Sequence, residues 1–169
     1  MRIVRTVVLT VAMAAVWACA PAPPLKEYIY PNWGFAVSFR GAPKATDTPA
    51  AADGSTVHTL LVESSVAGRD DLVNVIDGSG SAKSEDQALA DAPATLASAV
   101  GGTIGPITYA ATGQTIGREF LLSRQGKPPA RVRIFVANKH LYELIAQSDR
   151  GPDDPETANF LALFRLLGS

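Results

Sequence analysis

The first 18 residues limit this chain most, because they have the features of a secretory signal and not of a domain. Arg2 and Arg5 precede an apolar segment that runs from Val7 to Trp17 with a single threonine in it. This segment is too short to cross about 30 Å of hydrocarbon as a resident helix. A positive start, a short apolar core and small residues, in that order, are typical of a signal peptide that is removed on export. We therefore expect residues 1–18 to take no part in the fold.

The only cysteine of the chain, Cys19, follows this leader directly. A lone cysteine has no disulfide partner in an exported protein. The stretch Val16-Trp17-Ala18-Cys19 resembles the lipobox of bacterial lipoproteins, whose peptidase cuts before a cysteine that carries a diacylglycerol. The resemblance implies lipid attachment at Cys19 and a mature chain anchored in a membrane and facing the periplasm. Ala20 is not the aspartate that retains enteric lipoproteins in the inner membrane, so the outer membrane is favoured.

A second cleavage site stays open. Ala18-Cys19-Ala20 has the A-x-A form of an ordinary signal, and cleavage after Ala20 would release a soluble periplasmic or secreted protein. Residues 19–27 contain several prolines, which favour an extended conformation and suit a tether. We expect this tether to lead into a single domain over residues 28–169, a length typical of one domain.

Charge and composition argue against several kinds of partner. Loss of Arg2 and Arg5 with the signal leaves 13 of the 15 basic residues, against 16 acidic ones. A slightly negative domain has no basic stripe for nucleic acid. One cysteine and two histidines do not suffice for a cysteine/histidine zinc site. We expect no nucleic acid, no metal and no cofactor.

Alternating apolar residues predict most of the strands. We expect three strands in the first half of the domain, at residues 35–39, 55–63 and 71–77. Residues 41–54, rich in Ala, Pro, Thr and Asp, read as a loop. A four-strand meander is expected in the second half, at residues 103–111, 114–123, 131–137 and 140–146. The two-residue link Asn138-Lys139 suits a tight hairpin.

Two segments predict helices. Ser84 and Gln87 form a capping-box pattern ahead of an apolar stripe made by Leu89, Ala92, Leu96 and Val100. Pro93 inside that stripe predicts a kink or a break. Asp154 and Pro155 suit the start of a closing helix. The expected fold class is therefore α+β, with a central antiparallel sheet of about six or seven strands and helices packed on its faces.

Four short motifs occur in a fixed order along the domain. They are residues 34–39 (GFAVSF), 117–120 (GREF), 141–142 (LY) and 160–164 (FLALF). Together with the order of elements, they resemble the PsbP-like domain family, which includes the Mog-type Ran-binding proteins, over about Tyr28 to Leu167. The resemblance implies an antiparallel sheet with helices on both faces. Members of this family are mainly binding or assembly modules, so the fold alone implies no chemistry.

Arg131 and Arg133 are the candidate partner-docking face. They alternate with Val132 and therefore share one face of their strand. Two guanidinium groups side by side can form a small docking patch for an anionic surface, and a merely solvated face is the alternative.

Other candidate sites have simpler explanations. Asp149, Asp153, Asp154 and Glu156 offer hard oxygen ligands for a cation, but their spacing is not that of an EF-hand, and helix capping explains them. His58 and His140 would act together only if they met in space. The loop at residues 77–81 lacks the ending of a P-loop and the G-x-S-x-G frame of a hydrolase.

We expect a membrane-anchored lipoprotein that is a non-enzymatic binding or assembly module of the cell envelope. Its expected partner is another envelope protein, with the membrane reached through the N-terminal lipid. The alternative is a carrier or sensor of a small apolar ligand held between sheet and helix.

Overall fold

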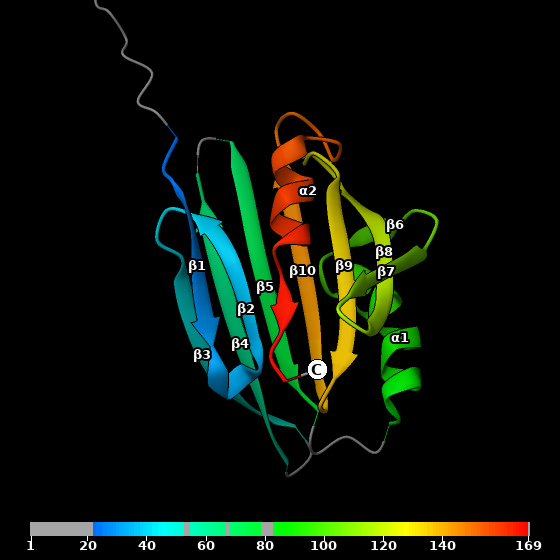
Figure 1. The fold of residues 1–169 in the computed structure, drawn as a ribbon. Coiled ribbons are helices and arrows are strands. Elements are labelled where there is room, and N and C mark those ends of the chain that lie inside the picture. The colour runs from blue at the N-terminus through cyan, green and yellow to red at the C-terminus, as the bar shows by residue number, and fades with distance from the viewer. Residues whose placement is uncertain (1–21, 53–54, 67, 79–82, 169) are drawn as a thin grey trace, which may run out of the picture.

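The computed structural model describes residues 22–52, 55–66, 68–78 and 83–168, which form an antiparallel α+β fold (Figure 1). The larger sheet has the strand order β3 (Lys44–Ala52), β4 (Ser55–Ser65), β5 (Arg69–Asp77), β10 (His140–Ser148), β9 (Ala130–Ala137), β8 (Thr115–Arg124) and β6 (Gly102–Ile104), with β7 (Thr108–Thr112) also paired to β8. The smaller sheet has the order β1 (Leu25–Tyr30), β2 (Phe35–Arg40) and β11 (Arg165–Leu166). The remaining elements are the 3-10 helix η1 (Pro31–Trp33), α1 (Glu85–Ala99) and α2 (Pro155–Ala162).

The predicted class is right in outline, but the sheet is larger and the helices are fewer than expected. Eight strands form the main sheet instead of six or seven, and a second sheet of three strands packs on it. One reason is that residues 41–54, expected to be a loop, contain strand β3. β3 is an edge strand, so Pro49 can lie opposite His58 without removing a hydrogen bond from a central ladder.

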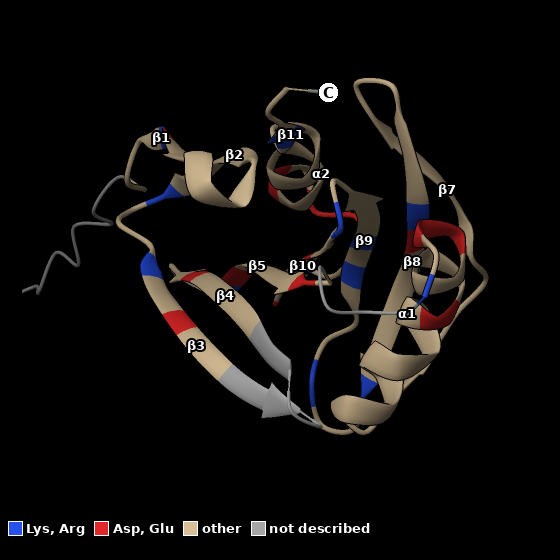
Figure 2. Cartoon of the chain, turned by 90° about the horizontal axis from the view of Figure 1, so that it is seen from below, with Lys and Arg blue, Asp and Glu red and all other residues tan. Residues whose placement is uncertain are grey.

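The main sheet lies between two layers, as the view from below shows (Figure 2). α1 covers one face over β8 and β9, with a core made of Ala92, Leu96, Ala97, Phe120, Leu122, Val132 and Ile134. The small sheet and α2 cover the other face, where the core is built around the rings of Phe35, Phe39, Phe135, Tyr142, Phe160 and Phe164. Elements therefore pack on both faces of the sheet, but on one face the cover is the single helix α1, which lies over β8 and β9.

Helix α1 begins with the predicted capping box. Ser84 Oγ accepts a hydrogen bond from the Gln87 N–H, and the Gln87 side chain accepts one from the Ser84 N–H. The helix continues through Pro93 without a break, and the proline is buried. The expected stripe ends early, because Val100 lies beyond the helix and is 37% exposed.

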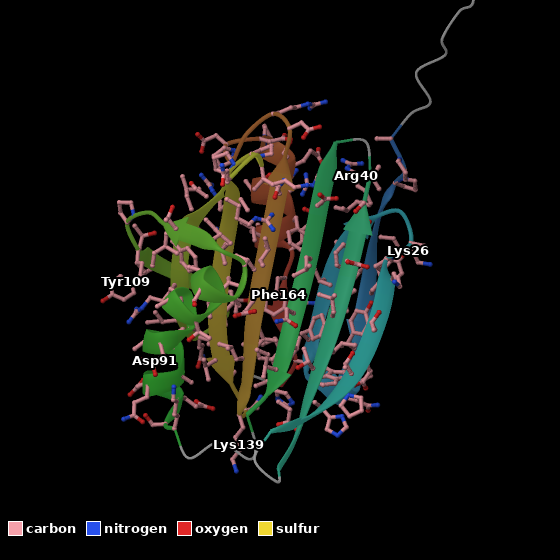
Figure 3. All side chains as sticks on the ribbon, turned by 180° about the vertical axis from the view of Figure 1, so that it is seen from behind. Lys26, Arg40, Asp91, Tyr109, Lys139 and Phe164 are labelled. Atoms are coloured by element: carbon pink, nitrogen blue, oxygen red, sulfur yellow. The ribbon has the colours of Figure 1, made fainter. Side chains whose placement is uncertain are left out.

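The strands run between two ends of the molecule. We call the end where the chain enters β1 the tether end. There Leu25 of β1 lies opposite Arg40 of β2, and Arg69 of β5 lies opposite Ser148 of β10. The far end holds η1 and the β9–β10 turn, which is the tight hairpin predicted, with positive φ angles of 51° at Asn138 and 65° at Lys139. Figure 3 shows Arg40 toward one end and Lys139 at the other.

Candidate functional site

A polar pocket of about 260 Å³ lies at the tether end. Its walls come from the end of β2, the β4–β5 turn, the loop between β10 and α2, and Ala22 of the tether. These segments are far apart in the sequence and meet because β2, β5 and α2 all end or begin at this end of the fold. We take the pocket as the candidate functional site.

Arg69 and Asp71 form the innermost ion pair of the pocket. Arg69 Nε and Nη2 donate to the two carboxylate oxygens of Asp71 at 2.7 and 2.9 Å, and the side chains are 11% and 7% exposed. Burial raises the pKa of Asp71, and the bonds from Arg69 oppose that shift. Arg69 Nη1 is buried, lies 3.9 Å from Glu156 Oε2, and has no hydrogen-bond partner among the described residues.

Arg40 connects residues of the tether to the pocket by a hydrogen bond. Its Nη1 donates to the carbonyl oxygen of Pro23 at 3.0 Å, and its Nε donates to Glu156 Oε2 at 2.7 Å. The bond from Arg40 holds the pKa of Glu156 below its ordinary value. The two arginines and the two carboxylates of Asp71 and Glu156 therefore neutralise each other across the pocket wall.

Asp153 and Asp154, two of the acidic residues before α2, are engaged within the protein. Asp154 caps the helix as expected: it accepts hydrogen bonds from the Glu156 N–H at 3.2 Å and from Ser148 Oγ at 2.6 Å. The bond from Ser148 lowers the pKa of Asp154. Asp153 Oδ1 lies 2.7 Å from Arg131 Nη2 in an ion pair. Within the described ranges, no group of three or more His, Cys, Asp or Glu side chains is arranged to hold a metal ion.

Arg131 and Arg133 lie on one face of β9, toward α2, and are 25% and 22% exposed. Arg131 pairs with Asp153, and Arg133 donates to Glu119 and, at 3.1 Å, to the carbonyl oxygen of Leu161. The two arginines thus join α2 and its preceding loop to the sheet. Their role in docking a partner stays a prediction.

The histidines have separate partners. His58 Nδ1 lies 3.8 Å from Asp47 Oδ1. His140 packs edge-on against Trp33, with 5.8 Å between the ring centroids. Cys19 and residues 79–81 of the Gly/Ser loop lie outside the described residues. The apolar-ligand hypothesis also stays a prediction, since α1 packs directly on the sheet and the pocket described above does not involve this helix.

The chain matches no family model and no curated protein. The resemblance to PsbP-like domains therefore remains a hypothesis that rests on the motifs quoted above. Among the described residues, no helix has both the length and the apolar character needed to span a bilayer.

Sequence reasoning missed the central pair of the pocket. Asp71 enters the prediction only as the first residue of the strand at 71–77, and Arg69 not at all, because nothing local marks the two as an ion pair. The one available signal was Arg40, a charge directly after the buried run of β2, where a carboxylate partner is favourable. That partner is Glu156, which lies 116 residues later in the chain.

Proposed function

We propose that this chain is an exported lipoprotein, anchored through Cys19, whose PsbP-like domain is a non-enzymatic binding or assembly module of the cell envelope. It faces the periplasm, with the outer membrane favoured. The observation that supports this best is the junction of tether and domain: Pro23 is hydrogen-bonded to Arg40, and β1 begins at Leu25. The folded domain therefore starts only a few residues after the proposed lipid site.

The charges at the tether end support a binding role over a chemical one. Arg40, Arg69, Asp71 and Glu156 are held in mutual bonds that fix their side chains. A general acid or base needs a group that is free to exchange a proton with a substrate. Paired, partly buried charges instead provide a rigid polar surface.

The binding role is tested by cross-linking in intact cells, followed by affinity capture of the full-length protein and mass spectrometry. We expect one recurrent envelope protein. Arg131→Gln should reduce its capture severalfold, because it removes a guanidinium from the predicted docking face. Asp153→Asn is the matched control, since it breaks the same ion pair but leaves the arginine in place, and it should retain the partner.

One result would remove the docking role of Arg131, and two others would contradict the proposal itself. Equal loss of the partner in both variants would limit Arg131 to holding the loop before α2. Absence of any recurrent partner would remove the support for a binding module, and turnover that depends on one side chain of the domain would overturn it.

A further inference from the structure

We infer that the tether end of the domain rests against the lipid headgroups and that the far end points away from the membrane. The inference builds on the proposed lipidation of Cys19. It assigns the polar pocket to the membrane-facing surface and leaves the far end uncovered. The proposed docking face of Arg131 and Arg133 begins beside the tether end of β9, on the flank of the domain.

The length of the tether carries the argument. Pro23 comes four positions after Cys19, and a fully extended chain spans at most about 3.6 Å per residue, or about 14 Å over these four steps. Pro23 is fixed to the domain by Arg40 Nη1. The lipid-bearing residue must therefore lie within about 14 Å of the pocket wall, whatever path the tether takes.

The domain is much longer than its tether. β10 has nine residues, and at about 3.4 Å per residue it spans about 30 Å from the tether end to the far end. With a tether shorter than half of that span, the domain cannot turn over so that the far end alone meets the bilayer, and we expect it to stand on its tether end. The far-end residues Asn32 and Lys139, both exposed, are then held well above the headgroups.

The charged residues of the pocket neither oppose nor drive this orientation, because they balance one another. At the pocket, Arg40 and Arg69 are balanced by Glu156 and Asp71. Because the covalent tether sets the position, the orientation should not depend on salt.

The composition of the mature chain makes a direct test possible. Cys19 is the only cysteine, so once it is lipidated, any introduced cysteine is the only free thiol. Three exposed positions sample the surface: Ala42 in the β2–β3 loop at the tether end, Thr48 midway along β3, and Asn32 in η1 at the far end. Trp33, the only tryptophan after the leader, adds a native probe at the far end.

The experiment uses the purified, lipidated protein in vesicles that contain phospholipids with a nitroxide on the headgroup. Each variant (Ala42→Cys, Thr48→Cys, Asn32→Cys) is labelled with a small fluorophore. We expect the nitroxide to quench the label at position 42 at least about threefold more than the label at position 32, and to leave Trp33 nearly unquenched. The extent of quenching at each position should be the same at low and high salt.

The possible failures are distinguishable. If position 32 is quenched as strongly as position 42, the domain has no fixed orientation, and if position 48 is quenched most, it lies on its side; both results overturn the inference. If the wild-type protein does not float with the vesicles at all, the lipid anchor itself is absent and the proposed function fails first.

Discussion

At the scale of single residues, Gly117 shows how one position limits the packing of two strands. A Cβ atom built there would lie 2.1 Å from the carbonyl oxygen of Ile134 and 2.5 Å from the ring of Phe135. The glycine therefore lets β9 and its aromatic side chain approach β8 closely. It belongs to the GREF motif on which the family resemblance partly rests, so this motif has a packing role whatever the function.

We predict that Gly117→Ala destabilises the domain by about 2 kcal/mol or more, since backbone and ring must both move. Urea denaturation of the purified domain measures the change. Gly105→Ala is the matched control: its added Cβ would meet only Leu121, at the ordinary distance of 3.8 Å, and stability should change little. Equal effects of the two substitutions would show that β8 and β9 are not so closely packed.

A second residue-scale prediction concerns Tyr142, whose buried hydroxyl donates to the Trp33 carbonyl oxygen at 3.0 Å. Burial raises the pKa of Tyr142 to about 12. The unfolded chain loses this proton near the ordinary value of 10, so folding stability should fall as the pH rises from about 10 to about 12. In Tyr142→Phe this contribution to the pH dependence should vanish, at a loss of about 1 kcal/mol at neutral pH.

Denaturation curves across this pH range test the prediction, with Tyr109→Phe as control because Tyr109 is 78% exposed. If wild type and Tyr142→Phe lose stability in parallel above pH 10, the hydroxyl is not held in its neutral form by the fold.

At the scale of elements, the Arg69–Asp71 pair opens β5, and Arg69 also bonds the first turn of α2 through the Glu156 carbonyl oxygen. Arg69→Met leaves a buried carboxylate without its partner, and we predict a loss of about 3–5 kcal/mol. The double variant Arg69→Met/Asp71→Leu should recover most of that loss, because no buried charge is left. Thermal and urea unfolding measure both. A double variant as unstable as the single one would contradict this view of the pair.

The elements also show what sequence reasoning can reach. Strands β2, β4, β5, β8, β9 and β10 follow alternating apolar patterns and were predicted within a few residues. The capping box and the Asn138-Lys139 turn are local features, and both are present. β3 was missed because an exposed edge strand needs little apolar patterning, and its structure comes from pairing with β4.

At the scale of the whole molecule, two features that escaped prediction depend on contacts distant in sequence. The second sheet gains its third strand because β11, only two residues long, pairs with β2. The pocket exists because Arg40 meets Glu156 and the β4–β5 turn meets the β10–α2 loop. No local pattern encodes such meetings, whereas the leader, the lone cysteine and the short tether are readable directly from the chain.

These readable features carry the central claim, which is that Cys19 anchors a compact domain close to a membrane. The most direct test is the intact mass of the mature protein purified from its own cells, for the wild type and for Cys19→Ser. We predict a wild-type chain that begins at Cys19 and carries a diacylglycerol, and a Cys19→Ser protein that lacks the lipid and leaves the membrane fraction. An unmodified wild-type chain that begins at Pro21 would contradict the claim and identify a soluble exported protein instead.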